Sequence, residues 1–298
     1  MGLAFVFGIG MPETYAREII RTRAKRNGRP HNLPKAESGV TFLEMAKVTV
    51  VDPLVMIVSE PIVILSSILL GANFGFLFQW FITVPFALQA TYNFSIQRVG
   101  LAFTAALAGT ALALATAILF DQIFHHMCRP SPSSMKPAKM IERLENRLWP
   151  AMVGVLLMVA ALFWVANTAT PSINYAVPII GTAVYVWGSM LVVIGIVAYL
   201  FDAYPPAGTL AALTAAACFR IAMAGVVPLF VIQAFMMATP KWTLMAFGFV
   251  VLGLSPVPYI LYFVGERLRG RSRYGHGSMM VGTKSGAGGS TEDMMARQ

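Results

Sequence analysis

Six stretches of the chain are mainly apolar over the length that a helix needs to cross a lipid bilayer, roughly 20 residues. An apolar run of this length with few charges is typical of a membrane helix. The sequence therefore predicts an all-α integral membrane protein with six transmembrane helices. The predicted spans are Pro61–Thr83, Val99–Phe120, Leu148–Val165, Tyr175–Leu200, Ala207–Ala238 and Trp242–Val264.

The composition agrees with a membrane protein and excludes the common soluble classes. Of the 298 residues, 57% are hydrophobic and 12% are charged, whereas an ordinary soluble domain carries about 25% charged residues. With a mean hydropathy of +0.69, the chain could not cover a compact globule with polar side chains. A soluble enzyme, a disordered protein and a secreted disulfide scaffold are therefore excluded.

Lysine and arginine are distributed unevenly among the segments that connect the predicted spans. The chain has 22 of them against 13 Asp and Glu, a net charge of +9. Only Arg98 and Lys241 fall on one side of the predicted membrane, Arg220 lies inside a span, and the others fall on the opposite side. Because basic residues concentrate in cytosolic loops, both termini are predicted to face the cytosol. Topology thus accounts for the basic charge, and no nucleic-acid binding is expected.

Three segments are predicted from these features. Residues 1–55 form a basic cytosolic connector, and its short apolar run Leu3–Met11 resembles the tail of a preceding span. Residues 56–266 hold the six-helix bundle. Residues 267–298, rich in Gly, Ser and Met, are predicted to be a disordered cytosolic tail. The sequon at Asn93, in the first outer loop, is a candidate glycosylation site.

Arg220 lies deep inside the fifth predicted span. A central arginine costs at least about 2.5–3.5 kcal/mol on insertion scales, so such a residue is expected to have a role. One role is an anion site or gating partner in a central cavity, and the alternative is an arginine that fixes helix packing. Its depth favours the cavity. Glu60 and Asp202 lie at the cytosolic ends of the first and fourth spans, where interfacial network residues are expected more than proton carriers.

Polar and aromatic residues share one face of the fourth predicted span. A spacing of three and four residues places them on one helical stripe. The stripe consists of Tyr175, Pro178, Thr182, Tyr185 and Ser189. Such a face suits the lining of a cavity for an amphipathic organic compound, and interhelical hydrogen bonding between packed spans is the alternative. In the first span, the amides of Asn73 and Gln79 must also point into the protein, toward either substrate or another helix.

Motifs for enzyme chemistry are absent from the sequence. It contains no G-x-S-x-G, no phosphate-binding loop, no H-E-x-x-H and no close pair of buried carboxylates. His125, His126 and Cys128 have no fourth ligand at metal spacing, and Cys218 is too distant to pair with Cys128. The sequence therefore predicts no enzyme activity, no metal site and no cofactor.

Short motifs occur in a fixed order along the chain. They are Met11-Pro12-Glu13-Thr14-Tyr15-Ala16, Glu60-Pro61-Ile62-Val63, Glu145-x-Arg147-Leu148, Val177-Pro178-Ile179-Ile180-Gly181, Tyr199-Leu200-x-Asp202-Ala203-Tyr204, Pro228-Leu229-Phe230 and Gly265-Glu266-Arg267-Leu268-Arg269. In this order they resemble fungal major facilitator transporters, and specifically the twelve-span drug:proton antiporters. The resemblance covers only the C-terminal half of that family, whose complete members have six further spans before the position of residue 1.

The resemblance implies proton-coupled efflux of small amphipathic organic compounds, such as a drug, a toxin or a secondary metabolite. Family members form one cavity between two six-helix halves, so this chain would supply one wall, from its first, second, fourth and fifth spans. Glu145 and Arg147 are expected to join Glu60 and Asp202 in gating or interfacial contacts.

The expected partners are the lipid bilayer, a small-molecule substrate, protons and a second six-helix half. The expected location is the plasma membrane, with the vacuolar membrane as the alternative. A second functional hypothesis stays open: a truncated half-transporter that moves nothing alone and acts as a binding or regulatory membrane subunit.

Overall fold

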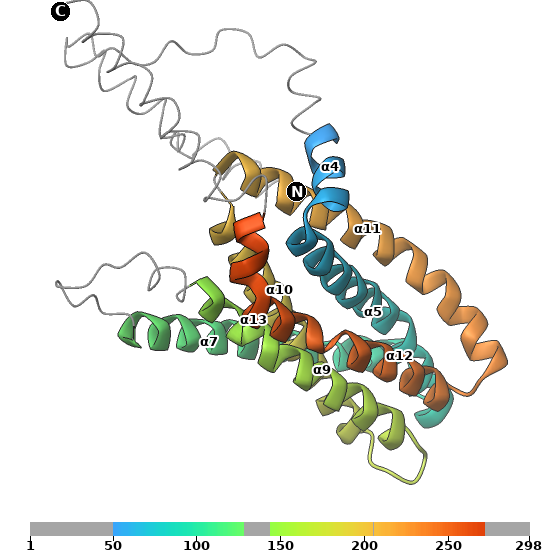
Figure 1. Ribbon diagram of the computed structural model, residues 1–298. Coiled ribbons are helices and arrows are strands. Elements are labelled where there is room, and N and C mark those ends of the chain that lie inside the picture. Colours follow the sequence, from blue (N-terminus) through green and yellow to red (C-terminus); the bar gives the residue numbers. More distant parts are fainter. Residues whose placement is uncertain (1–49, 128–143, 205, 272–298) are drawn as a thin grey trace, which may run out of the picture. The chain divides into compact units, whose positions relative to one another are not determined.

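The computed structural model describes residues 50–127, 144–204 and 206–271, and every element in these ranges is a helix (Figure 1). Within these ranges, six helical segments are long and apolar enough to cross a membrane. They cover Pro61–Tyr92, Ile96–Phe124, Asn146–Thr168, Ala176–Ala203, Gly208–Phe235 and Lys241–Gly270. These segments confirm the predicted all-α architecture and the number of spans. The described residues all lie in the second of two compact units, Lys47–Gln298.

The helices follow one another along the chain, and residues 128–143, between α7 and the next described helix, lie outside the described residues. Their bounds are α4 Asp52–Ser59, α5 Pro61–Tyr92, α6 Ile96–Ala102, α7 Thr104–Met127, the 3₁₀ turn η2 Asn146–Leu148, α9 Trp149–Thr168, α10 Ala176–Ala203, α11 Pro206–Met237, α12 Pro240–Leu254 and α13 Pro256–Arg271. The first span is longer than the predicted Pro61–Thr83. It ends where Asn93 takes a φ of 52°, the left-handed conformation that commonly terminates a helix.

The second and sixth spans each consist of two helices separated by one residue, a break that hydropathy alone does not predict. In the sixth span the break falls at Ser255, whose backbone N–H donates to the Leu252 carbonyl oxygen at 3.2 Å. The physical reason is Pro256, which has no N–H to continue the helical pattern. In the second span the break at Phe103 has a similar tight turn, and its N–H donates to the Gly100 carbonyl oxygen at 3.2 Å.

Helices extend past both predicted limits of the bundle, residues 56 and 266. α4 begins at Asp52 and α13 ends at Arg271. Basic residues in the last turns of α13 favour this extension, because cations near a helix C-terminus interact well with its dipole. Residues 1–49 and 272–298, which hold most of the predicted connector and tail, lie outside the described residues, so the division into three segments stays a prediction.

Packing inside the bundle pairs α5 with α11, and α10 with α9 and α7. Glycines allow α9 and α10 to approach closely. A Cβ built on Gly154 would lie 2.6 Å from the carbonyl oxygen of Gly188, and one built on Gly188 would lie 2.6 Å from that of Gly154. The spans differ strongly in burial. In α5 and in α10, 56% of an 18-residue apolar stretch is buried inside the protein, against 11% in the α6–α7 span and 18% in α11.

Candidate functional site

The contact between α5 and α11 positions Arg220. The two helices run side by side (Figure 1). They meet at two glycines of α5: a Cβ on Gly71 would lie 2.5 Å from a ring carbon of Phe219, and a Cβ on Gly75 would lie 3.1 Å from the carbonyl oxygen of Met223. This close approach brings the Arg220 guanidinium over the ring of Phe74, 4.6 Å from its centroid. Small residues on one helix thus place a charge of the other against an aromatic face.

Arg220 is half-buried and has no carboxylate partner among the described residues. Its Nε is buried and has no hydrogen-bond partner within residues 50–127, 144–204 and 206–271. The ring of Phe74 offsets part of the cost of the charge, because a cation over an aromatic face is stabilised by about 0.5–2 kcal/mol. The Arg220 side chain therefore keeps unused hydrogen-bond donors at membrane depth.

The predicted polar stripe of α10 lies mostly in the contact with α5. The Asn73 side-chain amide donates to the Ser189 carbonyl oxygen at 3.0 Å, and the Ser189 hydroxyl donates to the Asn73 side-chain oxygen at 2.8 Å. Both residues are buried. Of the two interpretations of this stripe, interhelical hydrogen bonding describes the Asn73–Ser189 pair. Their assignment to a substrate cavity stays a prediction.

Aromatic stacking supports the same contact. The rings of Trp80 and Tyr185 stack with centroids 4.2 Å apart and planes 10° apart. The Tyr185 hydroxyl and the Trp80 Nε1 are buried and have no hydrogen-bond partner in the described part of the chain. Gln79 donates to the Thr83 hydroxyl at 2.8 Å, and Thr182 donates to the carbonyl oxygen of Pro178 at 3.1 Å. These two side chains therefore form hydrogen bonds within their own helices.

Tyr175 is separate from the rest of the predicted stripe. It precedes the first turn of α10, is 51% exposed, and its ring lies 5.3 Å from that of Phe94 in an edge-to-face contact. The candidate glycosylation site Asn93 is also exposed and follows the last residue of α5. The glycosylation itself stays a prediction.

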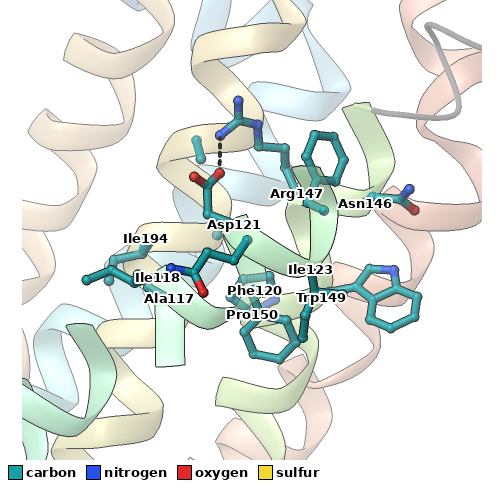
Figure 2. Close-up of a pocket in the computed structure, with 14 residues that line it drawn as sticks. Ala117, Ile118, Phe120, Asp121, Ile123, Asn146, Arg147, Trp149, Pro150 and Ile194 are labelled. Atoms are coloured by element: carbon teal, nitrogen blue, oxygen red, sulfur yellow. Dashed lines mark ion pairs between the residues drawn. The ribbon is translucent and has the colours of Figure 1, made fainter. Parts of the chain in front are cut away.

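An ion-pair network lies where α7 ends and α9 begins. Arg147 contacts Asp202 of α10, with Nε 2.6 Å from a carboxylate oxygen, and its Nη1 lies 4.0 Å from Asp121 of α7. Figure 2 shows Arg147 and Asp121 facing each other across the top of a cavity. The cavity has a volume of about 490 Å³ and is lined mainly by apolar residues of α7, α9 and α10, including Phe120 and Trp149. The structure thus brings together two predicted interfacial residues, Arg147 and Asp202.

Glu145 makes a second ion pair, with Arg269 of α13, at 2.5 Å. Burial raises the pKa of the Glu145 carboxyl above its ordinary value, and the Arg269 charge opposes this shift. Gly265 makes the contact possible, since a Cβ there would lie 2.7 Å from the Tyr199 hydroxyl and 3.1 Å from a Glu145 carboxylate oxygen. The ion pair connects α13 to the residue that precedes η2 and α9.

Glu60, the remaining predicted interfacial residue, is buried between α4 and α5. The Tyr204 hydroxyl donates to its carboxylate at 3.4 Å. Glu60 therefore connects the start of α5 to the end of α10, as Arg147 and Glu145 connect other helix ends.

Sequence reasoning missed the partners of these residues. Arg220, Arg147, Glu60 and Glu145 contact Phe74, Asp121, Tyr204 and Arg269 respectively. Tyr204 and Arg269 occur in the quoted motifs, and Asp121 directly follows the second apolar run, so a signal existed for these three. Phe74 stands four and seven residues before Phe78 and Phe81, a helical spacing that the sequence analysis did not use. Cys128 lies outside the described residues, as do the side chains of His125 and His126.

These helices and buried polar contacts define a multi-pass integral membrane protein. Curated proteins similar to this chain are fungal efflux pumps and transporters of the major facilitator type. The efflux pump FUB11 of Gibberella moniliformis is 31% identical over 89% of this chain and 44% of its own length. The MFS-type transporter traF of Penicillium crustosum is 29% identical over 92% and 54%. Polyamine transporter 4 of Saccharomyces cerevisiae is 27% identical over 93% and 46%.

The chain spans about half the length of the curated relatives that it matches. The alignments fall on the C-terminal portion of those proteins, which confirms the predicted resemblance to the C-terminal half of fungal major facilitator transporters. No family model and no solved structure matches the chain.

Proposed function

We propose that the chain forms the C-terminal six-helix half of a major facilitator-type exporter for small amphipathic organic compounds. The observation that carries this proposal is Arg220, a half-buried arginine near the middle of α11 without a carboxylate partner in the described residues. A charge at membrane depth is costly and commonly marks a substrate or ion pathway. The names of the relatives, an efflux pump among them, support export as the direction.

Replacing Arg220 with Ala tests this proposal. Efflux of a transported fluorescent compound from cells that express the exporter containing this half is expected to be lost while the amount of protein in the membrane stays normal. Arg98, an exposed arginine of α6, supplies the matched control, and Arg98→Ala is expected to keep efflux. Unchanged efflux by Arg220→Ala would leave Arg220 with a packing role only.

The proposed orientation places both termini in the cytosol of a plasma-membrane protein. The uneven distribution of lysine and arginine supports it. A tag on either terminus is expected to bind antibody only after the cells are permeabilised. Binding to a tag in intact cells would contradict the orientation, and a vacuolar signal would contradict the location.

Export is proposed to draw its energy from the proton gradient. An uncoupler is then expected to stop efflux at constant ATP. Efflux that persists in the uncoupler but stops when ATP is depleted would contradict proton coupling.

The alternative function is a half-transporter that binds but moves nothing without a second six-helix half. Only 18% of an 18-residue apolar stretch of α11 and 11% of one in the α6–α7 span are buried, which leaves surface on these two spans for a second half to cover. Chains that export when expressed alone in a host without related transporters would contradict this alternative. Export that requires a co-expressed second half would support it.

A further inference from the structure

Four phenylalanines form a continuous aromatic row beside Arg220. Phe74, Phe78 and Phe81 share one face of α5, because they are spaced four and three residues apart. Their ring centroids are separated by 5.3 Å and then by 6.1 Å. The row continues across to Phe103, between α6 and α7, whose ring stacks on Phe81 at 5.6 Å.

The middle of this aromatic row is accessible. Phe78 is 42% exposed and Phe81 is 52% exposed. The Arg220 guanidinium lies over Phe74 at one end of the row, and Phe103 closes the other end. The row therefore offers ring faces and edges along α5, with the Arg220 guanidinium as the positive charge that the described residues place where α11 packs against it.

The charge at the end of the row favours an anionic ligand. Arg220 forms no ion pair with any described residue, and its buried Nε has no partner among them. A guanidinium binds a carboxylate through two parallel N–H···O bonds, which gives both affinity and orientation. One positive charge neutralises a monoanion, whereas a dianion would keep an uncompensated charge beside apolar rings.

The rings set the shape of the remainder of the ligand. Aromatic side chains favour offset or edge-to-face contact with another flat ring, with centroids about 4.5–7 Å apart. A flat apolar body attached to a carboxylate would contact the phenylalanines while its carboxylate meets Arg220. A neutral or cationic ligand would leave the guanidinium unpaired.

We propose that Arg220 and the row of Phe74, Phe78, Phe81 and Phe103 bind a planar aromatic monocarboxylate. This inference rests on the proposed export function and names the substrate class of that site. Arg220 binds the carboxylate, and Phe78 and Phe81 contact the flat body.

A binding experiment on the full chain in lipid nanodiscs tests this assignment. The probe is radiolabelled 2-naphthoate, measured by equilibrium dialysis. Unlabelled 2-naphthamide, which is flat but neutral, and cyclohexanecarboxylate, which is charged but not flat, serve as competitors. Naphthoate is expected to compete best. Competition by the amide as strong as that by naphthoate, or no naphthoate binding, would overturn the proposal.

Variants locate the site. Arg220→Gln is expected to weaken naphthoate binding by roughly 10- to 100-fold, the range for hydrogen bonds to a charged group. Phe81→Leu is expected to weaken it by about 2- to 10-fold, as for the loss of an aromatic pair. Arg220→Lys keeps the charge and is expected to bind better than Arg220→Gln. Equal binding by the Lys and Gln variants would contradict the role of the charge.

Two exposed residues outside the row provide controls. Arg98→Gln on α6 and Phe249→Leu on α12 change the same residue types, and Phe249 is 61% exposed. Both variants are expected to bind naphthoate as the parent chain does. A loss of binding in Arg98→Gln equal to that in Arg220→Gln would overturn the assignment.

An efflux assay separates this inference from the proposed function. If naphthoate binds in an Arg220-dependent way but is not exported, the proposed binding site is supported and the proposed export function is contradicted. If neutral or cationic amphiphiles are exported and naphthoate does not bind, the proposed export function is supported and the proposed substrate class is overturned.

Discussion

Replacing Gly154 with Ala probes how tightly α9 and α10 pack. The added Cβ would lie 2.6 Å from the Gly188 carbonyl oxygen, whereas ordinary van der Waals contact begins at 3.4 Å, so the helices must part locally by about 0.8 Å. Parting of this size forfeits roughly a quarter to a half of the dispersion energy of the contacts it opens. Because the opposing atom belongs to the backbone, a side-chain rotation cannot relieve the clash.

The expected magnitude is the difference of two effects. Overpacking a well-packed interior costs about 1–3 kcal/mol, and the higher helix propensity of Ala returns at most about 1 kcal/mol. With the full propensity gain, Gly154→Ala should therefore lower the free energy of unfolding by about 0–2 kcal/mol, and by about 1–3 kcal/mol relative to a glycine-to-alanine change that causes no clash. Gly225 of α11 supplies the matched control, since a Cβ there meets no atom within 4 Å. Gly225→Ala should leave the free energy of unfolding unchanged or raise it.

Unfolding in mixed micelles, followed by circular dichroism as denaturing detergent is added, measures these differences. The double variant Gly154→Ala/Gly188→Ala adds a second methyl group to the same contact, and its cost should be smaller than the sum of the single costs, because the first methyl group has already parted the helices. A Gly154→Ala variant as stable as Gly225→Ala, or strictly additive costs, would refute this account of the α9–α10 contact.

Three further predictions concern polar contacts. Burial raises the pKa of the Glu145 carboxyl. Its contribution to the free energy of unfolding is therefore fully present below the unfolded-state pKa and is lost as pH rises through the folded-state pKa. In thermal melts, the stability advantage of the parent chain over Glu145→Gln should shrink with rising pH, and a constant difference would contradict this. Arg147 and Asp202 are partly exposed, so a double-mutant cycle with Arg147→Gln and Asp202→Asn should give a coupling energy below about 1 kcal/mol, and a much larger value would show a desolvated pair. Tyr185→Phe removes a buried hydroxyl that has no partner in the described residues, so this variant should keep or raise the melting temperature. Tyr185→Ala also removes the ring and should lower the free energy of unfolding by about 3–5 kcal/mol. A destabilised Tyr185→Phe variant would show that the hydroxyl forms a hydrogen bond.

The sequence by itself determined the class of the protein and the number of spans. Hydropathy over roughly 20 residues is a local property, and the bilayer imposes it on each span separately. The ordered motifs also indicated the family of relatives. The position of Arg220 within the fifth span showed that its charge needs a partner, because a buried charge is costly wherever the helix lies.

Only the tertiary structure decided which residues meet. A period of 3.6 residues tells which side chains share a helix face, but the helix that covers this face depends on the rotation and packing of the whole bundle. Asn73 and Ser189 are 116 positions apart and are hydrogen-bonded to each other, a contact between two helices that the spacing along either helix does not predict. Among the described residues, Arg220 contacts an aromatic ring and no carboxylate, because the glycines of α5 let α11 approach closely enough for the ring contact.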